Sequence, residues 1–218
     1  MANRKITRKY YFSLEGETEQ WYFQWLAKQI NSEPNATYQV SFDCKKKPPI
    51  KYAKSLTVTQ PTVVTHVFDY ESHDPIHTAQ FMTTLGGMKE AGNYGKKIAY
   101  KLGYSNFAFE LWIVLHKNDS FGSFTHRNQY LEPINRAYGE NFENLHQYKH
   151  EDNFKRVLRK LCFQNVKDAI HRARLITERN QECGYSLLNY KGYSYYRENP
   201  SLSIWESIEK ILSDCGLL

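Results

Sequence analysis

Strand-like and helix-like segments alternate through the first half of the chain, and this alternation limits the folds that it can adopt. Short runs rich in β-branched and aromatic residues, typical of strands, are separated by segments with the apolar periodicity of helices. The predicted strands cover residues 9–14, 38–44, 62–68 and 97–102, and the predicted helices cover residues 18–31, 52–56 and 74–89. This order favours an α/β fold in which a parallel sheet is flanked by helices.

The second half of the sequence is mostly helical in pattern. Predicted helices cover residues 107–116, 127–138, 152–162, 165–179 and 203–213, and the tyrosine-rich segment 185–197 has no clear assignment. A chain of 218 residues can bury one substantial α/β core. We therefore expect a single domain over residues 1–218, with a core at about 8–120 and a helical addition at about 121–218.

An acidic, glycine-containing turn follows the first predicted strand. Residues 12–23 read FSLEGETEQWYF, in which Glu15 is the first residue after the strand and a helical pattern begins shortly after it. The carboxyl ends of parallel strands meet at a crevice, and loops leaving them can direct side chains at a ligand without disturbing the core. Glu15 is therefore a candidate site residue.

The third predicted strand ends in a pair of acids, Asp69 and Glu71. Residues two apart on an extended strand point to the same face, so the pair can share one ion if the strand continues that far. Mg²⁺ takes oxygen ligands, often one or two carboxylates with water and phosphate oxygens. Together with Glu15, the pair predicts a magnesium site, with Asp74 as a further ligand if the loop folds back. The alternative is an ordinary polar loop that caps the next helix.

These residues resemble the Toprim domain of topoisomerases, primases and related nucleases, in which an acid after one strand is followed by an Asp-x-acid pair after a later strand. The chain is more closely similar to RloB-like proteins, the small Toprim-like members of bacterial anti-phage and abortive-infection loci. Residues 15–19, EGETE, resemble the EGxxTE start of that family with one spacer residue fewer. Residues 105–116, SNFAFELWIVLH, resemble its SNPxFExWxxLH segment, and residues 199–201, NPS, match a late motif.

Two residues depart from these patterns. Glu71 stands where the Toprim pair usually has aspartate, and its side chain is one methylene longer. Phe107 stands where the family segment has proline.

The resemblance implies a metal-dependent nuclease that cleaves DNA or RNA as the effector of an anti-phage defence system. It implies Mg²⁺, or Mn²⁺, held by Asp69 and Glu71, with Glu15 as a metal ligand or general acid/base and Glu110 as a further catalytic candidate. The chain has no P-loop spacing, and its resemblance to RloB-like proteins encoded beside ATPases implies a separate ATPase partner. A contrasting expectation is a noncatalytic adaptor that binds nucleic acid or the ATPase.

Glu110 lies in an otherwise apolar segment, where a buried carboxylate must be paired or bound to a metal. The alternative to a metal-binding role is a buried partner for His116, an arginine or a backbone amide. His116 itself is interpreted as a neighbour of Glu110 or as a phosphate contact.

The formal net charge of +6 favours attraction to polyanions. Lys45, Lys46, Lys47 and Lys51 form the densest cationic group and are predicted to contact nucleic acid, with a solvated loop as the alternative. Four widely spaced cysteines without a CxxC pair argue against a zinc cluster or a disulfide framework. With no apolar run of the roughly 20 residues that a membrane span needs, the sequence predicts a cytoplasmic protein without membrane contact.

Overall fold

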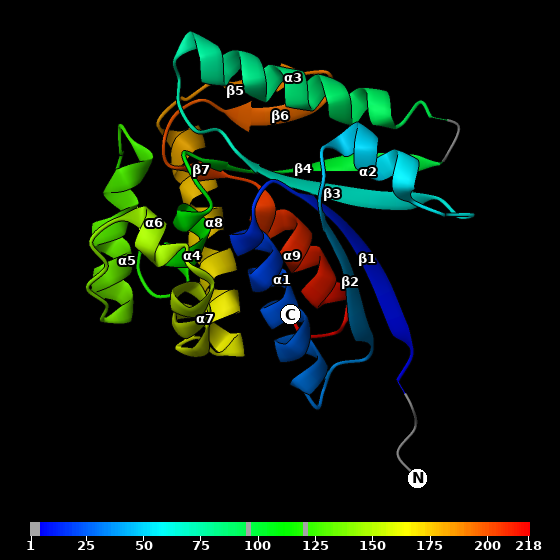
Figure 1. Ribbon diagram of the computed structural model, residues 1–218, viewed down its shortest axis with the longest axis horizontal. Coiled ribbons are helices and arrows are strands. Elements are labelled where there is room, and N and C mark those ends of the chain that lie inside the picture. The colour runs from blue at the N-terminus through cyan, green and yellow to red at the C-terminus, as the bar shows by residue number, and fades with distance from the viewer. Residues whose placement is uncertain (1–4, 95–96, 120–121) are drawn as a thin grey trace.

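A single twisted sheet organises the computed structural model, which describes residues 5–94, 97–119 and 122–218. The strand order is β2-β1-β3-β4-β7 (Figure 1). The first four strands pair in parallel, and β7 pairs antiparallel with β4 at the edge. The strands are β1 (Thr7–Leu14), β2 (Gln39–Lys46), β3 (Thr62–Asp69), β4 (Ile98–Asn106) and β7 (Ser201–Leu202). The α/β fold predicted from the alternating pattern is confirmed.

Helices cover both faces of the sheet (Figure 1). One face carries α2 (Pro49–Ser55) and α3 (Pro75–Ala91), which pack on Val64 and Phe68 of β3. The opposite face carries α1 (Glu17–Ser32) and α9 (Ile204–Asp214). Side chains of β3 are buried on both faces, as expected for a central parallel strand.

The helical part of the chain packs against the same side of the sheet as α1. Its first helix, α4, has every side chain buried, so it forms the centre around which the others pack. The elements are α4 (Glu110–Leu115), the 3₁₀ helix η1 (Arg127–Tyr130), α5 (Leu131–Tyr138), α6 (Leu145–Tyr148), α7 (Glu151–Arg159) and α8 (Phe163–Glu182).

The end of the chain returns to the sheet. Strand β7 pairs with Ser105 and Asn106, and α9 packs on the sheet through a hydrogen bond between Thr65 and Ser207. Residues that the sequence assigned to a helical addition therefore complete the main sheet. The unassigned segment forms a hairpin of β5 (Leu187–Tyr190) and β6 (Tyr193–Tyr196).

A solvated loop was the alternative for the lysine-rich segment, but its first residues form a strand instead. Lys45 and Lys46 belong to β2 and pair in register with Ser13 and Leu14. Pairing with a central parallel strand supplies backbone partners, which extends β2 until Pro48 precedes the next helix. None of the helices in the described part of the chain has the length and hydropathy that a membrane span requires.

Candidate functional site

The ends of β1 and β3 are joined at the carboxyl edge of the sheet. Leu14 pairs in register with Val67, and the Glu15 N–H donates to the Val67 carbonyl at 3.1 Å. The Asp69 N–H in turn donates to Oε2 of Glu15 at 3.1 Å. These reciprocal bonds fix the two acids side by side, as expected for loops that leave adjacent parallel strands.

Two further carboxylates and one ammonium group lie at the same place. The side chains of Glu19 and Glu110 are buried, and Nζ of Lys149 lies 3.0 Å from Oε1 of Glu110. Asp69 interacts electrostatically with Glu15, Glu19, Glu110 and Lys149. We call these four acids together with Lys149 the carboxylate cluster. Its members come from β3, α1 and α4 and from the residues that follow β1 and α6.

The glycine of the EGETE motif makes room for one of these acids. A side-chain carbon built at Gly16 would clash with Oε2 of Glu19. The Thr18 hydroxyl donates to that same oxygen at 3.0 Å. The motif therefore has a structural explanation, because Gly16 and Thr18 together turn Glu19 inward from the first turn of α1.

The pKa values in the cluster reflect an excess of buried negative charge. Burial raises the pKa of Glu19 to about 7 and raises that of Asp69 well above its usual range, with neighbouring acids adding to the effect. Glu15 keeps an exposed side, yet partial loss of solvent contact still raises its pKa. Burial alone would lower the pKa of Lys149, but Glu110 and Asp69 raise it overall. One ammonium thus faces four acids.

The donor chemistry of the cluster fits a hard divalent cation. All four acids offer carboxylate oxygens, and Oε2 of Glu110 is buried without a hydrogen-bond partner among the described residues. Within the same residues, no three His, Cys, Asp or Glu side chains are already placed around a common ion position. In this arrangement Lys149 supplies the positive charge. Glu15, Asp69 and Glu110, with Glu19 beside them, are the residues that would hold Mg²⁺ or Mn²⁺.

Glu71 lies apart from the acid with which the sequence paired it. Strand β3 ends at Asp69, and the intervening Tyr70 is buried against the α3 side of the sheet. Oε1 of Glu71 accepts from Arg127 at 2.6 Å, and Oε2 lies 3.3 Å from Nε2 of His77. Glu71 acts on the pKa of Glu15 only as one of several smaller influences. It occupies the rim of the cluster as an ion-paired residue.

The second and third sequence motifs meet in space and hold α4 in place. The Asn199 side chain donates to the Asn106 carbonyl, and so does the Tyr130 hydroxyl at 3.0 Å. The Asn106 side chain donates back to the Arg197 carbonyl at 2.7 Å. These contacts fix the start of α4, from which Glu110 enters the carboxylate cluster.

The three regions that resemble a known family thus converge on one group of acids. A family model described as RloB-like protein matches residues 10–211. The chain belongs to the RloB-like family. No curated protein and no solved structure matched it in the corresponding comparisons.

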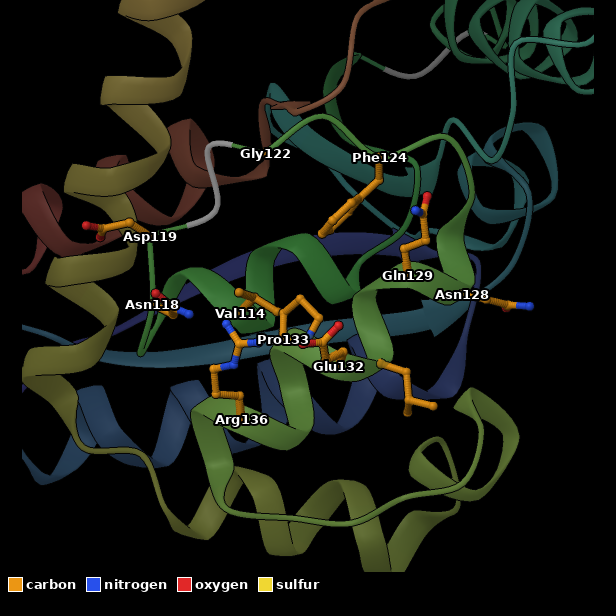
Figure 2. A pocket seen from close by; sticks show the side chains of 11 residues that line it. Val114, Asn118, Asp119, Gly122, Phe124, Asn128, Gln129, Glu132, Pro133 and Arg136 are labelled. Atoms are coloured by element: carbon orange, nitrogen blue, oxygen red, sulfur yellow. Dashed lines mark hydrogen bonds and ion pairs between the residues drawn. The ribbon is translucent and has the colours of Figure 1, made fainter.

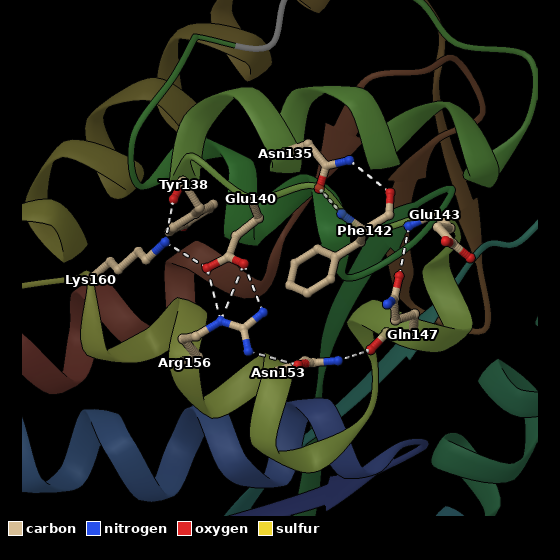
Figure 3. Close-up of polar contacts among 9 residues, drawn as sticks. All are labelled: Asn135, Tyr138, Glu140, Phe142, Glu143, Gln147, Asn153, Arg156 and Lys160. Atoms are coloured by element: carbon tan, nitrogen blue, oxygen red, sulfur yellow. Dashed lines mark hydrogen bonds and ion pairs between the residues drawn. The ribbon is translucent and has the colours of Figure 1, made fainter.

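A polar network supports the segment of the RloB-like chain that presents Lys149 (Figure 3). Glu140 forms ion pairs with Arg156 and Lys160 at 2.8 and 2.6 Å. Arg156 also donates to Asn153, whose amide donates to the Gln147 carbonyl at 2.7 Å, two residues before the lysine. Arg156, followed by Lys160, lowers the pKa of Glu140 to about 2. We call Glu140, Arg156 and Lys160 the Glu140 network.

The predicted lysines separate into two pairs. Lys46 and Lys47 line a pocket of about 350 Å³ together with Glu15. Lys45 and Lys51 are exposed and do not line it. Lys46 also lies 3.8 Å from Glu17, an exposed pair that contributes little.

His116 is a core residue, so its interpretation as a phosphate contact is wrong. Its ring is fully buried; Nδ1 donates to the Trp112 carbonyl at 2.8 Å, and the Tyr22 hydroxyl lies 3.1 Å from Nε2. Burial lowers the pKa of His116 to about 4, which keeps it neutral. The partner of Glu110 is Lys149 instead. Asp74, the suggested further ligand, caps α3 and binds His77.

Another pocket, of about 520 Å³, opens between the end of α4 and η1–α5 (Figure 2). Its lining includes Asn118, Asp119 and Arg136 but none of the carboxylate cluster. The chemistry expected of the acids therefore has no connection to it.

Sequence reasoning missed two members of the cluster. Glu19 stood within the EGETE motif but was not named as a candidate site residue, although its place in a matched motif was a usable signal. Lys149 lies in no recognised motif, and nothing in its local sequence indicates that it faces Glu110.

Proposed function

We propose that this RloB-like protein is a metal-dependent nuclease of the Toprim type. The observation that carries the proposal is the carboxylate cluster, where Glu15, Asp69 and Glu110 meet at the carboxyl edge of a parallel sheet. A divalent ion bound there would neutralise charge on the scissile phosphate and make bound water a better nucleophile. Lys46 and Lys47 flank the exposed side of Glu15, where a phosphate backbone would approach.

Glu15 is the acid best placed for proton transfer. It is the exposed member of the cluster, its pKa is raised, and its Oε2 is held by the Asp69 N–H. A carboxyl whose pKa is raised toward neutrality can accept and return a proton at working pH more readily than an ordinary one. In this proposal Glu15 exchanges a proton with the attacking or leaving oxygen, and Asp69 and Glu110 hold charge.

The biological setting follows from the family resemblance. We propose that the nuclease is the effector of a bacterial anti-phage system, acts in the cytoplasm on DNA or RNA, and is controlled by a separate ATPase. The sequence has no P-loop pattern, so this chain is not expected to hydrolyse ATP itself.

The decisive experiment compares two neighbouring glutamates, Glu15 before the N-cap of α1 and Glu17 at its first residue. Glu15→Gln should keep the fold and lower cleavage of DNA or RNA in Mg²⁺ or Mn²⁺ by roughly two to four orders of magnitude, the scale of acid/base groups. Glu17→Gln is the control, because Glu17 is exposed and pairs only weakly with Lys46. Cleavage should be assayed with and without a candidate ATPase partner of the kind that the family resemblance implies. Parental cleavage by Glu15→Gln would exclude the proposed role.

The structure also allows the two acids of the Asp-x-Glu pair to be separated. Asp69→Asn should weaken Mn²⁺ binding in calorimetric titration at least tenfold, because it removes charge from the centre of the cluster. Glu71→Gln should change Mn²⁺ affinity less than threefold, since Glu71 already forms an ion pair with Arg127. Equal losses in both variants would place Glu71 in the metal site after all.

A noncatalytic adaptor remains the second candidate, and one observation favours it. Lys149 already pairs with Glu110, so the cluster has a cation of its own. An adaptor would bind nucleic acid equally well as wild type, Glu15→Gln or Asp69→Asn and show no cleavage with either metal. Loss of anti-phage protection in Glu15→Gln, with unchanged nucleic-acid binding, would instead favour the enzyme.

A further inference from the structure

A pocket beside Glu15 lies on the face of the sheet opposite the buried carboxylates. It has a volume of about 350 Å³, at the lower end of the range for small-molecule sites. Its walls are Leu14 and Phe68 from the strands, Pro48 and Pro49 before and in α2, and Thr84 from α3. Mostly apolar walls of this kind suit a planar ring.

One polar side chain lies at the base of this pocket. His66 is only 4% exposed and lines the pocket from β3. Its Nδ1 lies 3.0 Å from the Ser13 carbonyl and 2.7 Å from the Ser13 hydroxyl. A carbonyl can only accept, so Nδ1 carries the proton and Nε2 has a free lone pair. Burial lowers the pKa of His66 to about 4, which agrees with a neutral ring.

The free nitrogen of His66 is left without a hydrogen-bond partner among the described residues. No hydrogen bond to Nε2 is formed by any described residue, and Nε2 is not among the fully enclosed unpaired atoms, so it opens into the pocket. The ring is held by stacking on Phe68, with centroids 4.9 Å apart and planes inclined by 27°. A fixed acceptor at the end of an apolar pocket selects a planar ligand that carries an N–H donor.

Charge at the mouth of the pocket indicates what is attached to that planar group. Lys46 and Lys47 are exposed there and carry the positive charge that a phosphate requires. Glu15 stands at the same mouth and connects the pocket to the carboxylate cluster. We propose that the pocket binds one nucleotide, with its base donating an N–H to Nε2 of His66 and its phosphate at Lys46 and Lys47.

This inference rests on the proposed nuclease function and adds to it. A nucleotide held with its phosphate beside Glu15 places a phosphodiester next to the cluster, so the pocket sets which base flanks the cleaved bond. The occupant can be a free nucleoside monophosphate or a nucleotide unit of a longer strand, because both present the same base and phosphate.

The test measures binding without metal and without cleavage. Calorimetric titrations with the four nucleoside 5′-monophosphates are compared with ribose 5-phosphate, which lacks a base. At least one nucleotide should bind ten times more tightly than ribose 5-phosphate. His66→Phe keeps a ring on Phe68 but removes the acceptor, and should weaken that nucleotide about tenfold. Nucleotides that bind no better than ribose 5-phosphate would overturn the proposal.

A pair of variants in α3 guards against the case in which His66→Phe disturbs the fold of the strand. Thr84→Phe narrows the pocket from the partly exposed side of α3 and should abolish nucleotide binding. Thr83→Phe is the matched control, because Thr83 is the neighbouring, exposed residue and does not line this pocket. Equal binding by both variants would overturn the proposal even if His66→Phe fails to fold.

The two proposals fail in different ways. If the protein cleaves nothing but binds a nucleotide, and Thr84→Phe abolishes that binding, the pocket would be supported and the nuclease function excluded. Cleavage that depends on Glu15, in a protein whose Thr84→Phe variant binds nucleotides as tightly as the parent, would support the nuclease and exclude the pocket. With oligonucleotides, an altered base preference in Thr84→Phe supports a nucleotide unit of a strand as the occupant. An unaltered base preference, in a protein that binds a monophosphate tightly, supports the free nucleotide as the occupant.

Discussion

The carboxylate cluster and the Glu140 network differ in how far cationic side chains compensate their negative charge. In the cluster, four acids face one ammonium group, and the pKa values of Glu15, Glu19 and Asp69 are raised. In the network, one acid receives two cations, and the pKa of Glu140 is lowered to about 2 (Figure 3). The network has more cationic than acidic side chains, whereas the cluster has more acidic than cationic ones.

This difference in charge balance suggests a structural role for the Glu140 network, whereas the carboxylate cluster lowers the stability of the folded state. A balanced, hydrogen-bonded group fixes the segment between α5 and α7 at little cost. Acids held together with too few cations destabilise the folded state unless something else supplies positive charge. Perturbed acids of this kind occur most often at functional sites. The imbalance is therefore the reason to assign function to the cluster.

The largest expected effect comes from removing one lysine from each group. Lys149→Met leaves Glu110 buried without a cation and should lower the free energy of unfolding by about 2 to 3 kcal/mol at pH 8, a figure reduced because Lys149 is partly exposed. Lys160→Met should cost about 1 kcal/mol, because Arg156 still binds Glu140. Urea denaturation measures both.

Added Mg²⁺ sharpens that comparison. It should recover part of the stability lost in Lys149→Met and have no such effect on Lys160→Met, because a cation bound only by the folded state stabilises it. Equal losses of unfolding free energy in the two variants, with no response to Mg²⁺, would show that negative charge is compensated as fully in the cluster as in the network.

The sequence was sufficient for the sheet and for part of the site. Apolar periodicity located the four parallel strands, and the acids after the first and third strands met as parallel topology requires. Strand β7 has only two residues, too few to give any periodic pattern. Segment 185–197 is a hairpin whose first strand is exposed throughout, so burial leaves no alternation to read.

The remaining site residues depend on contacts that sequence spacing does not encode. The position of the Glu71 side chain depends on the end of β3 at Asp69 and on an ion pair with Arg127, which is distant in the sequence. Lys149 reaches Glu110 only because the polar network holds α6 and α7 in place. His116 carries no sequence mark that distinguishes a core histidine from an exposed one.

A smaller effect is expected from neutralising one buried acid of the cluster. The folded pKa of Glu19 is about 7 against an ordinary value of 4.5, so its destabilising charge is absent below pH 4.5 and complete above pH 7. Glu19→Gln should therefore raise the free energy of unfolding at pH 8 by about 1 to 2 kcal/mol and change it little at pH 4.5. Thermal unfolding at the two pH values tests this. A variant less stable than the parent at pH 8 would contradict it.

The smallest effect on the free energy of unfolding is expected at Glu140, where the change has the opposite sign and pH dependence. Its folded pKa of about 2 lies below the ordinary 4.5, so its contribution to stability is complete above pH 4.5 and is lost as the pH falls toward 2. Glu140→Gln should lower the free energy of unfolding by about 1 kcal/mol at pH 7, since its partners are partly exposed, and by progressively less at pH 4 and pH 3. Glu132→Gln, which breaks an exposed pair with Arg136 on α5, is the control and should have no measurable effect. If the loss in Glu140→Gln were the same at pH 7 and pH 3, its cause would be packing, and the contrast of charge balance between the two regions would fail.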